Sequence, residues 1–376
     1  FILLVVGRIL QGIGAGIALP LMFNIVLQQA PVGKLGVMMG FATLIIAIAP
    51  AVGPSFGGFL VEAFGWRSIF LVLLPFLGLS LVLGALTVRQ ARDVEKVGFS
   101  PVQFLLVAAG FTALVVAVNA ASESAWTSPK TLGLLALAFA LLAGFTWISR
   151  RSDTPLLRVR IFTDRTYSLS LAYAVLIQAA VLALGYLIPY FAQVAKSVGS
   201  FAAGCLLLPG CIIGAILTPF GGRLLDRFGA KRPILAGAAV GVATLACFAA
   251  FGAEGSAVRL AFIYVFFPIC QGLSLSNSMT HGLRSLPEDL QADGNAAFNT
   301  VQQLGGAVGT AVAAAIVNSA QAGSSGDVVA GTTAGAQTAF YVLLGAGAAA
   351  FAAALGVFLR PRRGQAEKRS RSGLID

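Results

Sequence analysis

Residues 168–192 read SLSLAYAVLIQAAVLALGYLIPYFA and contain no charged side chain. A membrane-spanning helix needs about 20 mostly apolar residues, so this run is long enough to cross a bilayer. Ten further runs of similar character lie on either side of it, and none alternates apolar and polar residues as membrane β-barrels do. We therefore predict an all-α polytopic membrane protein. Its eleven predicted spans are 3–28, 36–60, 67–88, 102–121, 131–149, 168–192, 201–220, 233–252, 258–281, 296–319 and 337–359.

The composition of the whole chain agrees with this prediction. Of its 376 residues, 58% are hydrophobic and 10% are charged, whereas soluble domains carry about 25% charged residues. A chain this apolar cannot cover a surface that faces water. The composition therefore excludes a soluble enzyme, a disordered protein and a disulfide scaffold. The four cysteines lie within apolar runs without the spacing of metal ligands, so we expect no metal site.

The basic residues are unequally distributed between the loops on the two sides of the membrane. One of the 25 Lys and Arg residues, Arg8, lies inside the first run, and 20 fall on one side of the membrane. The other side holds only four, which are Arg67, Lys130, Lys196 and Arg259. Cytoplasmic loops collect Lys and Arg, so we predict that the 20-rich side and the C-terminus are cytoplasmic. The net charge of +11 then reflects topology in a cell (inner) membrane and does not indicate nucleic-acid binding.

The N-terminal sequence indicates a truncation. The chain begins Phe1-Ile2-Leu3-Leu4, without Met and already inside an apolar run. The predicted topology places Phe1 outside the cell. An odd number of preceding helices would return the native N-terminus to the cytoplasm, so we expect such helices upstream.

Four local motifs carry a family resemblance. They are LVVGRILQGIGA at 4–15, GPSFGG at 53–58, GRLLDRFGAKR at 222–232 and GNAAFNTVQQLGGAVGT at 294–310. Together they resemble the major facilitator superfamily, and in particular its fourteen-helix drug:proton antiporter branch (the EmrB/QacA type). Two positions depart from the family pattern: Ala49 replaces a leading glycine, and Ala230 replaces a basic residue.

The resemblance also implies a domain organisation. The eleven spans correspond to helices four to fourteen of that branch, so three helices are expected to be missing. Residues 1–88 would be the remnant of an N-terminal bundle, and 89–165 two extra helices with a basic loop. Residues 166–376 would be the complete C-terminal six-helix bundle with a basic tail. The Ala-, Gly-, Ser- and Thr-rich stretch 320–336 is expected to form an external loop.

The resemblance implies roles for three groups of residues. Proton coupling is assigned to Arg8 and Gln11. Sealing of the cavity against proton leak is assigned to the antiporter motif of Gly53, Pro54, Gly57 and Gly58. A cytoplasmic gate is assigned to Gly222, Asp226, Arg227, Gly229 and Lys231. Each has a simpler explanation: an arginine reaching the outer surface, helix packing, and a positive loop that sets topology.

Polar residues within the spans are candidates for a substrate cavity. We rank Asn24, Gln178 and Gln271 first, with Tyr173, Tyr186 and Tyr190 as aromatic walls. Hydrogen bonding between helices explains the polar residues equally well. All fourteen acids lie in loops or at span ends. The proton-binding carboxylate is therefore expected on the missing helices.

These features predict a secondary active transporter. It would export small amphipathic compounds or drugs by alternating access, coupled to protons and embedded in a lipid bilayer. We expect no enzymatic activity and no cofactor, and no ATP-binding loop occurs in the sequence. The alternatives are a transporter of another solute on the same fold and a non-transporting membrane remnant. The sequence leaves open whether a periplasmic adaptor takes part.

Overall fold

The computed structural model describes residues 2–29, 35–87, 99–124, 127–152 and 155–359. Within these ranges the chain forms helices and no strands. The long helices are α1 (Ile2–Gln29), α2 (Leu35–Phe64), α3 (Ser68–Thr87), α4 (Pro101–Ser124), α5 (Pro129–Arg151), α6 (Arg165–Lys196), α8 (Leu208–Phe228), α9 (Lys231–Phe251), α10 (Ala257–Ser285), α11 (Gln291–Gly323) and α12 (Val328–Phe358). The short helices are η1 (Val159–Thr163), α7 (Ser200–Cys205) and η2 (Glu288–Leu290).

Every predicted span coincides with a helix. The seventh run is divided into α7 and α8. Ten stretches of the described residues are long and apolar enough to cross a membrane, and the 30-residue α2 corresponds to the remaining predicted run. The prediction of an all-α multi-pass membrane protein is therefore confirmed. The predicted 88/89 boundary and the basic tail after residue 359 lie outside the described residues.

The predicted external loop at 320–336 is wrong in extent. α11 continues to Gly323 and α12 begins at Val328, so the connection is four residues long. The small residues in this stretch lie mostly within helices, where they allow α11 and α12 to pack closely. A Cβ built on Gly335 of α12 would lie 2.8 Å from the Cα atom of Val317 in α11. Composition alone could not separate these two uses of glycine and alanine.

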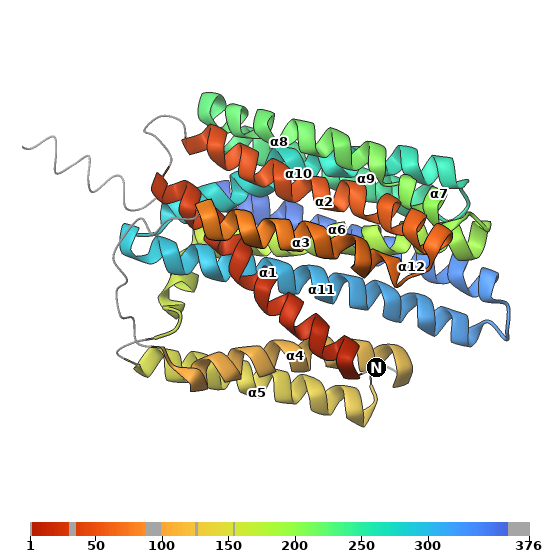
Figure 1. Ribbon diagram of the computed structural model, residues 1–376, viewed down its shortest axis with the longest axis horizontal. Helices are drawn as coiled ribbons and strands as arrows, with labels where there is room; N and C mark the ends of the chain where they lie inside the picture. The colour runs from red at the N-terminus through yellow and green to blue at the C-terminus, as the bar shows by residue number, and fades with distance from the viewer. Residues whose placement is uncertain (1, 30–34, 88–98, 125–126, 153–154, 360–376) are drawn as a thin grey trace, which may run out of the picture.

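The second half of the chain forms a helical bundle in which α6 and α10 contact several neighbours each (Figure 1). Tyr173, Phe191, Phe248, Phe267 and Phe340 are fully buried in its core. α4 and α5 pack against each other, and α4 also packs against α11. From the first part of the chain, α2 makes the main contact with the bundle, through α7 and α8.

Glycines set the approach of α6 and α11. A Cβ built on Gly305 would lie 2.6 Å from Cγ1 of Val175, and one built on Gly309 would lie against the carbonyl oxygen of Ala179. Lipid tails supply no hydrophobic force that drives two helices together, so close packing of small residues is a main source of attraction. These two glycines therefore hold the long pair α6–α11 together.

Gly309→Ala should lower the melting temperature of the detergent-solubilised chain. The added Cβ would meet a backbone atom of α6, and overpacking of this kind typically costs about 1–3 kcal/mol. Gly345→Ala on α12 is the matched control, because no described atom lies within 4 Å of its built Cβ. The control should melt at or above the parent temperature, since alanine favours helix. Equal melting of Gly309→Ala and the parent would contradict the close approach.

Candidate functional site

A cavity of about 400 Å³ lies between α2, α6 and α7. Its walls include Pro54 and Gly58 from α2, Tyr186 and Tyr190 from α6, and Ser200 from α7. None of the lining residues is charged. Small-molecule sites are typically concave and mainly apolar with a few polar groups, and this cavity has that character.

Two stacked tyrosines form the aromatic wall of the cavity. The rings of Tyr186 and Tyr190 lie 5.3 Å apart between centroids at an angle of 20°. The hydroxyl of Tyr190 accepts a hydrogen bond from Nε2 of Gln321 at 3.1 Å, and Gln321 also donates to Oγ1 of Thr332 at 2.7 Å. α11 and α12 thus hold Tyr190 in place. A fixed aromatic face suits a flat apolar or cationic ligand.

Polar groups stand beside this wall. The hydroxyl of Ser200 donates to Oε1 of Gln193 at 3.0 Å, and Nε2 of Gln193 donates to the carbonyl of Pro189 at 3.2 Å. Sequence reasoning found the two tyrosines but missed Gln193 and Ser200. Tyr186, Tyr190 and Gln193 follow an i, i+4, i+7 spacing, which places them on one helix face and could have identified the glutamine.

Only part of the antiporter motif contacts α7. A Cβ built on Gly58 would lie 2.6 Å from the carbonyl oxygen of Ser200, and one built on Gly204 would lie against the carbonyl oxygen of Pro54. A Cβ on Gly53 or Gly57 would have no described atom within 4 Å. The backbones of α2 and α7 therefore meet at Pro54 and Gly58, beside the cavity.

A carboxylate extends this contact at the end of α2. Oε2 of Glu62 accepts a hydrogen bond from the backbone N–H of Phe201 at 3.1 Å. The rings of Phe59 and Phe201 meet edge to face, with centroids 6.1 Å apart. α2 and α7 are thus joined by polar, aromatic and backbone contacts over two helical turns.

Arg8 and Gln11 lie together on α1. Nη1 of Arg8 donates to Oε1 of Gln11 at 3.1 Å, and Cζ of Arg8 lies 5.0 Å from the ring centroid of Phe70 in α3. Both polar side chains are exposed. Among the described residues, no carboxylate forms an ion pair with Arg8. The proposed coupling role of this pair stays a prediction.

The cytoplasmic gate motif spans the end of α8 and the start of α9. Gly229 has a φ of 75° and donates its N–H to the carbonyl of Leu225 at 2.9 Å, which ends α8 in a conformation that favours glycine. Arg227 and Arg232 lie over the same ring, with Cζ 5.3 and 5.4 Å from the centroid of Phe228. The ring of Phe228 thus forms cation–π contacts with both of these arginines.

Other members of this motif make few contacts. Asp226 lies near the end of α8, and α9 begins at Lys231 with no side-chain cap. Within the described part of the chain, Asp226 forms no ion pair. No described atom lies within 4 Å of a Cβ built on Gly222. The structure therefore does not join α8 to α9 through Asp226.

Two of the polar residues ranked for a substrate cavity, Gln178 and Gln271, lie elsewhere. Oε1 of Gln178 on α6 accepts a hydrogen bond from Nε2 of Gln302 on α11 at 3.2 Å. Gln271 on α10 is half-buried, and neither Gln178 nor Gln271 lines the cavity described above. The side chain of Asn24 lies outside the described set. Tyr173 is buried in the core, where its hydroxyl is 2.5 Å from Oγ of Ser274.

Comparison with known proteins gives a consistent family match. The family model described as Major Facilitator Superfamily matches residues 1–310. The lincomycin resistance protein LmrB of Listeria monocytogenes is 33% identical over 348 residues, which cover 90% of this chain and 74% of the relative. The putative multidrug resistance protein MdtD of Serratia proteamaculans is 27% identical over 317 residues, which cover 84% and 66%. A solved structure of the nucleoside transporter NupG is 15% identical, with a TM-score of 0.46 and coverage of 91% and 88%.

Gly58→Ala should loosen the contact between α2 and α7, whereas Gly57→Ala should not. An added Cβ at Gly58 must displace the backbone of Ser200, but a Cβ at Gly57 enters open space. The half-buried Cys205 follows Gly204 on α7 and can report the change. With the other three cysteines replaced, a membrane-impermeant maleimide should label Cys205 roughly ten-fold faster in Gly58→Ala, the equivalent of about 1.4 kcal/mol. Equal labelling rates in both variants would contradict the contact.

Proposed function

The chain belongs to the major facilitator superfamily, a family of transporters, and on that premise we propose that it exports small amphipathic compounds in exchange for protons. The observation that carries the proposal is the cavity that adjoins the backbone contact of α2 with α7. Two relatives whose names refer to lincomycin and multidrug resistance support drugs as the substrate class. The four family motifs and the lack of an ATP-binding loop in the sequence, which predict a gradient-driven transporter, agree with this proposal.

The chemistry of the cavity supports amphipathic substrates. Its volume of about 400 Å³ lies in the range of small-molecule sites. The stacked Tyr186 and Tyr190 offer an aromatic face, while Gln193 and Ser200 offer an amide and a hydroxyl. Because no lining residue is charged, we expect recognition by shape, stacking and a few hydrogen bonds. Such a site accepts many related compounds.

Alternating access would use α2 as the contact between two moving units. α2 joins the first helices to the second bundle through α7 and α8. Opening the cavity on this side requires Pro54 and Gly58 to part from Gly204 and Ser200. The domain division at 1–88, 89–165 and 166–376 fits this movement, with the cell (inner) membrane as location and the C-terminus in the cytoplasm.

Proton coupling would involve Arg8 and Gln11. The hydrogen bond that Nη1 of Arg8 donates to Oε1 of Gln11 orients the guanidinium. A cation within about 4–6 Å of a carboxyl group favours its ionised form, so Arg8 would promote proton release from an acid nearby. The gate motif at 222–232 would engage the first unit from the cytoplasmic side in another state of the cycle.

Proteoliposomes that contain the full-length protein should move lincomycin or ethidium in the direction opposite to proton flow when a pH gradient is imposed. A protonophore should abolish the movement, because the gradient is the proposed energy source. Accumulation of either compound against its own concentration gradient, in the absence of a pH gradient, would refute proton coupling. Failure to move either compound, with the chain correctly inserted, would refute export of this substrate class.

Arg8→Ala should reduce gradient-driven efflux by about ten-fold or more. The change removes a charge-assisted hydrogen bond, an interaction worth about 1.5–3 kcal/mol, and the cation that biases the acid. Arg67→Ala is the matched control, because Arg67 is also exposed and also lies over an aromatic ring, that of Trp66. Downhill movement of the same compound should survive in both variants. Equal effects of the two changes on gradient-driven efflux would argue against a coupling role for Arg8.

A further inference from the structure

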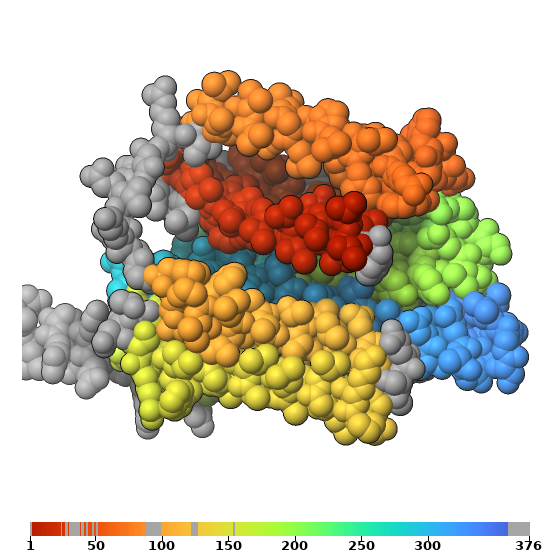
Figure 2. Space-filling view, turned by 60° about the horizontal axis from the view of Figure 1, so that its bottom comes forward, coloured from red at the N-terminus to blue at the C-terminus, as the bar shows by residue number. Residues whose placement is uncertain are grey.

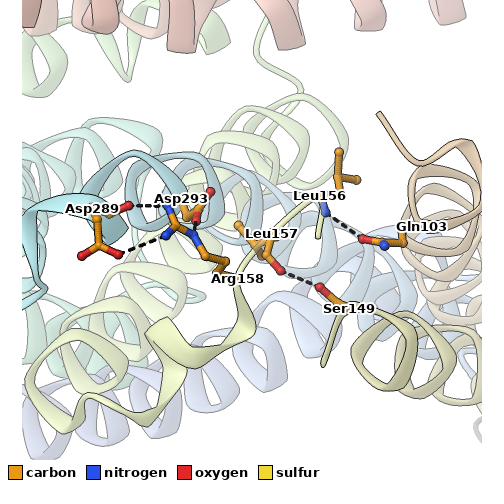
Figure 3. A network of polar contacts seen from close by, with 7 residues as sticks. All are labelled: Gln103, Ser149, Leu156, Leu157, Arg158, Asp289 and Asp293. Atoms are coloured by element: carbon orange, nitrogen blue, oxygen red, sulfur yellow. Dashed lines mark hydrogen bonds and ion pairs between the residues drawn. The ribbon is translucent and has the colours of Figure 1, made fainter. Parts of the chain in front are cut away.

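The short segment Leu156–Arg158 joins three helices (Figure 3). The backbone N–H of Leu156 donates to Oε1 of Gln103 on α4 at 2.7 Å. The hydroxyl of Ser149 on α5 donates to the carbonyl of Leu157 at 2.5 Å. Gln103 is only 1% exposed and Ser149 only 4%. Polar groups this deeply buried need hydrogen-bond partners, so these two bonds fix the segment to α4 and α5.

Arg158 joins the same segment to the second bundle. Its Nε donates to Oδ2 of Asp293 at 2.6 Å, and its Nη1 donates to Oδ2 of Asp289 at 3.0 Å. Its Nη2 donates to the carbonyl oxygen of Asp289. The hydrogen bond with Asp293 raises the pKa of the Arg158 guanidinium. One guanidinium thus forms three hydrogen bonds, which connect the segment to both η2 and the first turn of α11.

These ion pairs lie at the surface, but they form a network on one guanidinium. Single exposed pairs contribute little, but a planar guanidinium with several well-placed acceptors is both stronger and geometrically specific. Asp293 lies in the first turn of α11, where a carboxylate also interacts favourably with the helix dipole. Arg158 therefore holds one orientation of the segment relative to α11.

An apolar cluster secures the residues that follow. Ile161 in η1 is buried together with Tyr167, Leu286 and Phe298. The hydroxyl of Tyr167 donates to the carbonyl of Gly294 at 2.7 Å. Oδ1 of Asp164 accepts a hydrogen bond from Ser285 at 2.8 Å. The chain between α5 and α6 is therefore docked on α10 and α11 over most of its described length.

The packing of α4 and α5 is one-sided. α4 contacts α5 and α11, while neither helix makes a comparable contact with α1, α2 or α3 among the described residues. Figure 2 shows α4 and α5 side by side along the lower edge and α3 along the upper edge, with α1 between them in this view. Every strong attachment of the pair therefore leads to the second bundle.

We propose that α4 and α5 are a fixed part of the second bundle and that Arg158 is the positioning residue that holds them there. During transport, α4 to α12 then move as one unit against α1 to α3. This inference rests on the proposed alternating access for its role in the cycle. The attachment itself is a property of the folded chain and can be tested separately.

Two spin labels can measure the attachment directly. Arg150 at the end of α5 and Glu288 on η2 are exposed and take no part in the bonds described here. With the native cysteines replaced, labels at Arg150→Cys and Glu288→Cys should give one narrow distance distribution in the full chain in lipid. We expect that distribution to stay unchanged between acid and neutral pH and after addition of ethidium.

Arg158→Ala should broaden this distribution and shift it to longer distances. Arg160→Ala is the matched control, because Arg160 has the same charge, lies two residues away and forms no ion pair with a described residue. Arg158→Asp should broaden the distribution as Arg158→Ala does, and adding Asp293→Arg should narrow it again. That recovery by an exchange of charges would not follow from a general loss of folding.

Two outcomes would overturn the proposed attachment. One is a distribution in Arg158→Ala that matches the parent and Arg160→Ala. Another is a parent distance that changes together with a second label pair at Ala63→Cys and Ala202→Cys, which reports the α2–α7 contact. A chain that exports neither ethidium nor lincomycin but keeps a narrow, Arg158-dependent distance would refute the proposed function and leave the attachment standing.

Discussion

Backbone contact between α2 and α7 is the interaction on which the transport proposal depends. Side chains larger than hydrogen at Gly58 and Gly204 would hold the two helices apart. Within lipid, attraction between helices comes from close packing and polar contacts, so the absence of side chains at these two positions creates the interface. The same interface supplies one wall of the cavity. Any movement that opens the cavity there must therefore break a backbone contact between the two parts of the chain.

The remaining helix contacts are unevenly distributed between the two parts of the chain. α6, α10 and α11 are joined by buried aromatic residues and by glycine contacts such as that of Gly309 with Ala179. At one end of these helices, Arg158 adds ion pairs at the junction of α5, η2 and α11. α1 and α3 have few partners among the described residues. The structure therefore combines a tightly joined second bundle with a first part that is attached mainly by α2.

Much of this architecture could be predicted because the bilayer imposes simple rules. Long uncharged runs must be helices, and each predicted span coincides with one. Arg8 and Gln11 are three residues apart, so any helix would place them on one face. Other features depend on contacts between distant segments. Gly57 and Gly58 are neighbours of the same type, and only the rotation of α2 decides which one meets α7. Arg158 and Asp293 are 135 residues apart, and no local pattern connects them.

The attachment through Arg158 bears on how a helical pair can be added to a transporter during evolution. An insertion between two bundles that bridged both would resist their relative movement and would be selected against. A helical pair that is attached to one bundle by a short bridging segment moves with that bundle alone. The ancestral interface between the bundles can then keep its shape.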